Sequence, residues 1–161
     1  AIVAGIFWLA VVLVALNRLA DGLDGPLARA AGGGTDLGGY YDIVFDFLFY
    51  GAIPLAFALH DPERNALAAA VLLASFYANG ATFLAFAALA ARTARTTTVQ
   101  GRKAIYYLAG LAEGAETIAV FLAMCLWPYH FRAIALAFAG LCFLSAAARI
   151  IMVRAMLRAA E

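Results

Sequence analysis

The stretch Asp21-Gly22-Leu23-Asp24-Gly25-Pro26-Leu27-Ala28-Arg29, followed after eight residues by Gly38-Gly39-Tyr40-Tyr41-Asp42-Ile43-Val44-Phe45-Asp46, decides how this chain folds. It places four aspartates within strongly apolar sequence. A charged side chain at mid-bilayer costs about 2.5–3.5 kcal/mol on insertion scales, so four uncompensated aspartates would cost on the order of 10 kcal/mol. We therefore expect these carboxylates to bind cations or to face a water-filled cavity.

Helical spacing groups these residues on two faces. At about 100° per residue, positions 21, 24, 25, 28 and 29 lie within an arc of about 140° on one helix. Positions 38, 42 and 46 follow at intervals of four on the next helix, where successive side chains are roughly 5–6 Å apart. A short turn between the helices would bring Asp21 and Asp24 opposite Asp42 and Asp46. The pattern predicts an all-oxygen cluster that suits Mg²⁺ or Mn²⁺.

The composition is that of a membrane protein. Of the 161 residues, 66% are hydrophobic and 13% are charged, and the mean hydropathy is +0.92. Soluble domains are about half apolar and about a quarter charged, so we expect an all-α, polytopic transmembrane helical bundle that forms one domain over residues 1–161. The net charge of +1 gives no reason to expect a nucleic-acid partner. Cys125 and Cys142 lie in apolar segments without metal-ligand spacing, so we expect buried thiols.

The apolar runs predict five helices, at about 1–30, 37–59, 66–91, 104–127 and 131–157. Glycines end the first helix, and we favour a plain turn there over a loop that holds a phosphate. Thr35 or Asp36 can cap the second helix, and Pro62 lies near the start of the third. His60 beside Asp61 lies at the opposite end of its helix from the aspartates, and we expect an exposed loop histidine.

The pattern D-x-x-D-G-x-x-A-R-x8-G-x3-D-x3-D is met without a gap by Asp21, Asp24, Gly25, Ala28, Arg29, Gly38, Asp42 and Asp46. It resembles the signature of the CDP-alcohol phosphatidyltransferase family. The resemblance implies an integral membrane enzyme of six helices, usually a homodimer, that moves a substituted phosphate from a CDP-linked donor to an alcohol while CMP leaves. The family has one helix before the five predicted here, and this chain begins with Ala1 and not with an initiator Met. We therefore expect the chain to begin inside a longer protein.

The resemblance and the chemistry together assign roles to these residues. Two divalent ions, Mg²⁺ or Mn²⁺, would neutralise the pyrophosphate and stabilise the attacking and leaving oxygens. The residues assigned chiefly to metal are Asp21, Asp24 and Asp42. Asp46 is the candidate general base for the acceptor hydroxyl and also contacts a metal, as is usually proposed in the family. The residues assigned to the nucleotide site are Gly25, Ala28, Arg29 and Gly38. Small residues there let a nucleotide approach the helix backbones, although close helix packing also favours them.

Three polar side chains of the third predicted helix share one face. Ser75, Asn79 and Thr82 follow at intervals of four and three residues. Polar side chains of membrane helices commonly form hydrogen bonds to neighbouring helices. We favour that role for these residues over substrate binding.

Arg149 has two interpretations, and both stay open. Buried charges in membrane helices pair with one another or face a cavity. Arg149 therefore either forms an ion pair with Glu113 or Glu116 or, together with Arg102 and Lys103, receives a phosphate on the acceptor.

The basic residues predict the orientation of the chain. The polar linker 92–103 carries four basic residues, and Arg154 and Arg158 lie near the C-terminal end. Cytoplasmic segments are rich in Lys and Arg, and the motif turn lies on the same side as the linker. We therefore expect a multi-pass protein of a bacterial inner membrane, in contact with the lipid bilayer, whose active site faces the cytoplasm.

Three classes of function fit these features, and the transferase is favoured. It would move a phosphatidyl group from CDP-diacylglycerol to a polar alcohol; alternatively, a soluble donor such as CDP-choline or CDP-ethanolamine would react with diacylglycerol. A divalent-cation transporter would have acids along a pore, whereas here all four cluster toward one side. A non-catalytic scaffold would not need all four acids.

Overall fold

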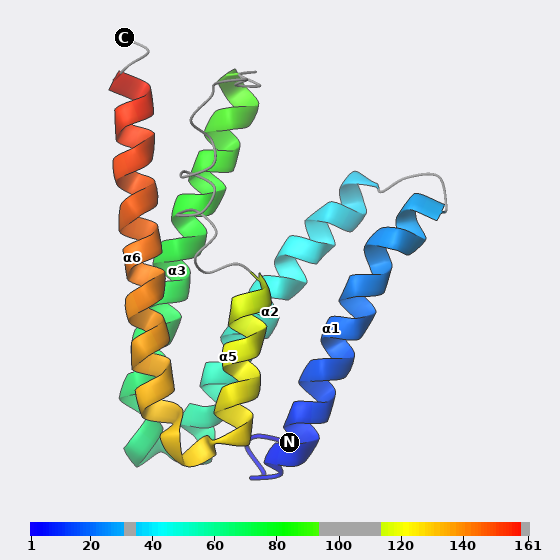
Figure 1. Ribbon diagram of the computed structural model, residues 1–161, viewed down its shortest axis with the longest axis vertical. Coiled ribbons are helices and arrows are strands. Elements are labelled where there is room, and N and C mark those ends of the chain that lie inside the picture. The colour runs from blue at the N-terminus through cyan, green and yellow to red at the C-terminus, as the bar shows by residue number, and fades with distance from the viewer. Residues whose placement is uncertain (31–34, 94–113, 159–161) are drawn as a thin grey trace.

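The computed structural model describes residues 1–30, 35–93 and 114–158, and for residues 21–30 and 91–93 it describes the backbone alone. Within this part the chain forms five α-helices and one short 3-10 helix, and no strand (Figure 1). The elements are α1 (Phe7–Ala30), α2 (Asp36–His60), α3 (Pro62–Thr93), α5 (Gly114–Leu126), the 3-10 helix η1 (Pro128–His130) and α6 (Phe131–Arg158). The predicted all-α helical bundle is confirmed.

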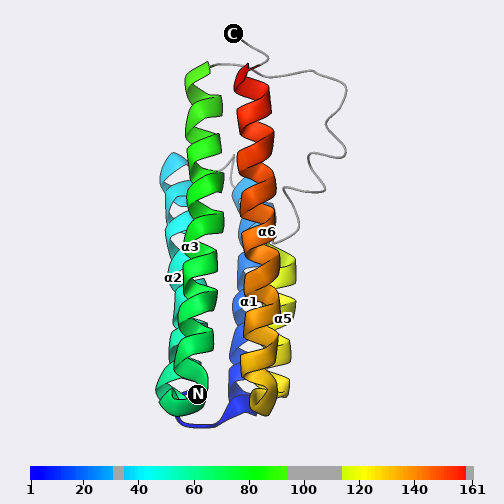
Figure 2. The ribbon, with the colours of Figure 1, turned by 90° about the vertical axis from the view of Figure 1, so that its left-hand side faces the viewer.

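The helices do not pack in the order of the sequence. α3 packs against α6, α2 packs against α3, and α5 lies against both α1 and α6. In Figure 1, α2 passes behind α5 toward α3, and Figure 2 shows α3 and α6 side by side. The consecutive helices α1 and α2 therefore have different main packing partners.

The helix ends that flank the motif lie toward one end of the bundle. The end of α1, the start of α2 and the ends of α3 and α6 all point toward the top of Figure 1, whereas η1 and the α2–α3 junction lie at the bottom. Arg154 and Arg158 are in the last turns of α6 and so lie toward the top. The ends of α1 and α2 that flank the motif turn are thus on the same side of the bundle as the end of α3.

Three of the described helices are long and apolar enough to cross a membrane: Asp36–His60, Pro62–Ala90 and Pro128–Arg158. Phe7–Ala20 and Gly114–Leu126 are apolar but shorter. Large apolar side chains cover the outside, including Trp8, which is 71% exposed, and Tyr77, which is 81% exposed. Such an exterior suits lipid as the surrounding medium. The chain is therefore a multi-pass integral membrane protein.

The start of the chain differs from the prediction. Residues 1–5 form a turn, and α1 begins at Phe7 rather than at Ala1. Gly5 has a φ of +72°, which an L side chain rarely adopts and glycine adopts freely. His60 contacts this turn, because its Nδ1 lies 3.3 Å from the carbonyl oxygen of Val3 and its ring meets that of Phe7 edge-on. His60 is exposed, as predicted, but it is the last residue of α2 and not part of a loop.

Side-chain caps set the starts of α2 and α3. The Gly38 N–H donates to Thr35 Oγ1 at 3.1 Å, so Thr35 is the cap of α2, one of the two predicted. α3 begins at Pro62, before the predicted start at Ala66. The reason is that Asp61 Oδ1 accepts a hydrogen bond from the Arg64 N–H at 3.1 Å, while proline suits the first helical position. Residues 104–113 of the predicted fourth helix lie outside the described residues.

Aromatic rings fill the core. Phe57 of α2 stacks on Phe131 of α6 with ring centroids 4.3 Å apart, and both side chains are fully buried. Phe121 of α5 meets Phe76 of α3 at 6.1 Å and Tyr50 of α2 at 5.9 Å. Edge-to-face contacts of this kind favour particular ring orientations. The rings therefore fix the spacing of α2, α3, α5 and α6.

Small side chains occupy the tight places between helices. Cys125 and Cys142 are free and buried, as predicted. Gly80 of α3 faces Phe47 of α2, and a β-carbon at residue 80 would overlap the Phe47 ring. The close approach of α2 to α3 at this point thus depends on a residue without a side chain.

Candidate active site

Asp42 and Asp46 lie one turn apart on the same side of α2, as their spacing of four predicts. Asp42 is exposed, whereas only 30% of the Asp46 side chain is exposed. Carboxylates in a membrane helix need compensating charge or polar contacts. The neighbours of Asp46 therefore matter most for its chemistry.

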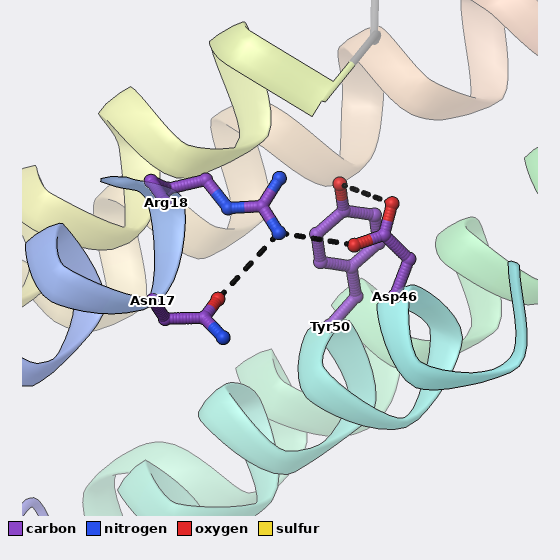
Figure 3. Close-up of polar contacts among 4 residues, drawn as sticks. All are labelled: Asn17, Arg18, Asp46 and Tyr50. Carbon is purple, nitrogen blue, oxygen red and sulfur yellow. Dashed lines mark hydrogen bonds and ion pairs between the residues drawn. The ribbon is translucent and has the colours of Figure 1, made fainter. Parts of the chain in front are cut away.

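The guanidinium of Arg18 on α1 reaches Asp46 on α2. Arg18 Nη2 donates a hydrogen bond to Asp46 Oδ1 at 3.1 Å and lies 3.5 Å from Oδ1 of Asn17 (Figure 3). The same guanidinium lies over the ring of Phe49, with 6.0 Å between Arg18 Cζ and the ring centroid. Hydrogen bonds between charged partners are about twice as strong as neutral ones. A charge-assisted bond thus joins α1 to α2 beside the motif.

Tyr50 contacts Asp46 from within α2. Its hydroxyl donates a long hydrogen bond of 3.5 Å to Asp46 Oδ2, so both carboxylate oxygens are engaged, one by Arg18 and one by Tyr50 (Figure 3). The Tyr50 ring packs against aromatic rings of α3 and α5. A β-carbon on Gly114, the first residue of α5, would lie 3.2 Å from the Tyr50 hydroxyl oxygen. Packing from α3 and α5 therefore holds Tyr50 beside Asp46.

The first half of the motif is helical, because α1 runs through it to Ala30. Its side chains, those predicted for the metal and nucleotide sites, lie outside the described residues: Asp21, Asp24, Ala28 and Arg29, with Gly25 among them. Arg18 precedes Asp21 by three residues and so shares its side of the helix. The bond from Arg18 to Asp46 indicates that this side of α1 faces α2.

A divalent cation fits the chemistry of the described donors. Carboxylate oxygens are the ligands that Mg²⁺ and Mn²⁺ prefer, and Asp42 and Asp46 present them one turn apart on α2. Among the side chains that the structure describes, no three acidic, histidine or cysteine groups come together. The cluster of four aspartates therefore stays a prediction, because half of it lies in residues 21–30.

Gly38, predicted for the nucleotide site, is exposed in the first turn of α2. Its N–H is used by the Thr35 cap, and a β-carbon there would lie 3.3 Å from Thr35 Oγ1. Local cap geometry thus already favours a small residue. The connection 31–34 lies outside the described residues, so the choice between a plain turn and a phosphate-holding loop stays open.

Arg149 is 5% exposed on α6 and bonds to α3. Its Nη1 lies 3.0 Å from the carbonyl oxygen of Asn79, 3.1 Å from Asn79 Oδ1 and 2.9 Å from Thr82 Oγ1. Its Cζ lies 5.8 Å from the ring centroid of Phe83. The predicted inter-helix hydrogen bonds are confirmed for Asn79 and Thr82. Ser75 instead donates to a carbonyl oxygen of its own helix at 2.7 Å.

The predicted partners of Arg149 fall into two groups. Glu116 is exposed near the start of α5 and forms no ion pair within the described residues, so pairing of Arg149 with Glu116 is wrong. The other residues named with Arg149 lie outside the described residues: Arg102, Lys103 and Glu113. Pairing with Glu113 and the binding of an acceptor phosphate by Arg102, Lys103 and Arg149 stay predictions.

Arg18 and Tyr50 were not among the site residues predicted from the sequence. Tyr50 extends the series 38, 42 and 46 by another interval of four, and Arg18 lies on the arc of α1 that carries Asp21. Both signals are present in the spacing. The spacing alone does not show that Arg18 and Tyr50 both contact Asp46. That depends on which side of α1 faces α2, which is set by the packing of the bundle.

Comparison with known proteins extends over nearly the whole chain. The model of a family described as CDP-alcohol phosphatidyltransferase matches residues 1–157, which include almost all of the helical part. The inner membrane protein YnjF of Escherichia coli (strain K12) is 47% identical over 146 residues, which cover 91% of this chain and 70% of that protein. No solved structure matches the chain.

Proposed function

Because this chain belongs to the CDP-alcohol phosphatidyltransferase family, we propose that it transfers a phosphatidyl group from CDP-diacylglycerol to a polar alcohol and releases CMP. In this reaction the alcohol oxygen forms a bond to the phosphorus that carries the diacylglycerol. The bond from that phosphorus to the oxygen of CMP breaks, and the hydroxyl proton passes to a base on the enzyme.

The ion pair between Arg18 and Asp46 supports this proposal most directly. It brings the side of α1 that continues with Asp21 toward the side of α2 that carries Asp42 and Asp46. The ion pair thus supports the proposal that the acidic motif, which is interrupted in the sequence, is carried by facing sides of two helices. Such an arrangement suits a substrate with two phosphates, which needs several oxygen ligands around its counter-ions.

The four aspartates are assigned two roles, cation binding and proton transfer. Three are assigned chiefly to two Mg²⁺ or Mn²⁺ ions: Asp21, Asp24 and Asp42. Bound there, the ions would neutralise the pyrophosphate and stabilise the charge on its oxygens. Asp46 accepts the proton of the alcohol and also contributes to the cation site. The Tyr50 hydroxyl contacts one oxygen of its carboxylate, which supports this role because a base must be oriented toward the proton that it takes.

The nucleotide is assigned to the ends of α1 and α2 that flank their connection. The residues that would bind it are Gly25, Ala28, Arg29 and Gly38. The exposed backbone at Gly38 supports this assignment, because a nucleotide can approach it closely. Arg29 would bind a phosphate through its planar guanidinium.

The acceptor and the setting complete the proposal. We assign the acceptor's phosphate, where it has one, to Arg102, Lys103 and Arg149. The acyl chains of the donor would lie in the bilayer beside exposed apolar side chains such as Leu48, which is 62% exposed.

The site would face the cytoplasm, since Arg154 and Arg158 lie at the same end of the bundle. The relative named as an inner membrane protein supports that membrane, and a homodimer is carried over from the family.

The decisive experiment is CMP release from radiolabelled CDP-diacylglycerol by full-length protein in membranes, across a panel of polar alcohols. We expect CMP only when both Mg²⁺ and a suitable alcohol are present, and none from the folded Asp42→Asn variant. CMP formed only from CDP-choline or CDP-ethanolamine with diacylglycerol would assign the alternative donor. Folded protein that releases no CMP from any pair would reject the transferase.

A further inference from the structure

Arg18 and a divalent cation would compete for the same carboxylate. Arg18 Nη2 lies 3.1 Å from Asp46 Oδ1, and the Tyr50 hydroxyl lies 3.5 Å from Oδ2. The side chains of Arg18 and Asp46 are only 22% and 30% exposed. Opposite charges interact more strongly in such partly desolvated surroundings than in water. The carboxylate that is assigned to the cation site is thus already neutralised by this chain.

We infer that Arg18 is the internal counter-ion of Asp46, which a divalent cation must displace, and that Arg18 thereby lowers the cation affinity of the acidic site. The inference rests on the proposed function for the assignment of Asp46 to the cation. A guanidinium and a metal ion repel each other, so both cannot sit against Oδ1. By linkage, the free energy of the interaction between Arg18 and Asp46 is lost when the cation displaces Arg18, and the binding free energy of the cation is smaller by that amount.

Arg18 has contacts other than the one to Asp46. Its Nη2 is also 3.5 Å from Asn17 Oδ1, and the guanidinium lies over the Phe49 ring. Both contacts come from neighbours that do not depend on Asp46. Because the arginine stem is flexible, we expect rotation of this side chain to free Oδ1. Without a cation, the ion pair compensates a carboxylate that would otherwise be costly in a membrane helix.

The test is Mn²⁺ binding to purified full-length protein in detergent, without nucleotide or alcohol, measured from the electron paramagnetic resonance signal of free Mn²⁺. Arg18→Gln should tighten Mn²⁺ binding by about fivefold or more, the lower end of typical coupling between sites. Arg64→Gln is the matched control, because Arg64 also faces an aspartate, Asp61 at 4.0 Å, but at the opposite end of α2. It should leave Mn²⁺ binding unchanged.

A double-variant cycle isolates the role of Asp46. In an Asp46→Asn background, Arg18→Gln should change Mn²⁺ affinity by less than about twofold, because the shared partner is gone. The same gain in that background would show a general charge effect and overturn the inference. If Arg18→Gln does not purify as a folded protein, Arg18→Met, which keeps the apolar stem over Phe49, decides by the same criteria.

The remaining outcomes separate the inference from the proposed function. Unchanged or weaker Mn²⁺ binding in Arg18→Gln, alongside wild-type protein that binds Mn²⁺ and releases CMP, would overturn the counter-ion role and leave the transferase standing. Absence of Mn²⁺ binding by the wild-type protein would overturn the counter-ion role, and CMP release would then decide the proposed function by itself.

Discussion

Arg18 Nη2 lies 3.1 Å from Asp46 Oδ1 and so connects two helices that have different main packing partners, α1 on α5 and α2 on α3. The aromatic stack of Phe57 on Phe131 belongs to the opposite end of α2. The polar site and this part of the core are therefore separate. Substitutions in the site should change activity more than stability. Substitutions of residues that pack between helices should change stability more than activity.

Asp46→Asn should lower CMP release by at least about 100-fold, since an amide cannot accept the proton and general-base catalysis typically contributes that much. Binding of the CDP-linked donor should be largely retained. Turnover and binding of radiolabelled donor measure the two effects. Asp36→Asn, at an exposed aspartate in the first turn of the same helix, is the control and should keep its turnover. Near-wild-type activity of Asp46→Asn would reject its role as base.

Removal of divalent cations should abolish CMP release, and added Mg²⁺ or Mn²⁺ should restore it. The physical reason is that the pyrophosphate keeps its full negative charge without them and repels the alcohol oxygen. Assays with and without a chelator measure the effect, and circular dichroism checks that the helices persist. Undiminished turnover in chelator would contradict the assignment of aspartates to cations.

Gly80→Val should destabilise the bundle by about 1–3 kcal/mol, because overpacking forces neighbouring side chains out of place and a β-carbon at residue 80 overlaps the Phe47 ring. Thermal unfolding in detergent measures the change. The control is Gly140→Ala on α6, where a β-carbon has nothing within 4 Å and alanine favours the helix by up to about 1 kcal/mol. Adding Phe47→Ala should partly restore Gly80→Val. An unaltered melting temperature in Gly80→Val would refute this packing role.

Arg149→Gln should lower stability by about 1–2 kcal/mol, the range of inter-helix hydrogen bonds in membranes, because it removes contacts to Asn79 and Thr82. Arg154→Gln, at an exposed position on the same helix, should have no such effect. Unfolding in detergent and the acceptor KM are measured together. Loss of acceptor affinity with stability unchanged would instead select the acceptor-phosphate role.

Much of this architecture is determined locally and is therefore readable from the sequence. The apolar runs predicted the helices, and the intervals of four from Gly38 to Asp46 predicted one face of α2. Thr35 was predicted as a possible cap and is the cap. These features depend on helical periodicity, hydrophobicity and short-range hydrogen bonds, which involve residues within a few positions of each other. Gly5 is the local exception, because an apolar run does not reveal that its φ is positive.

Only the tertiary structure decided which side chains meet across helices. Arg18 and Asp46 are 28 positions apart, and Arg149 is 70 positions from Asn79. At a given depth a buried charge can be satisfied by several partners, so the sequence left Glu113, Glu116 and a phosphate as alternatives for Arg149. The rotation of each helix about its axis selects among them. That rotation is set by the packing of the whole bundle, which no single segment of sequence contains.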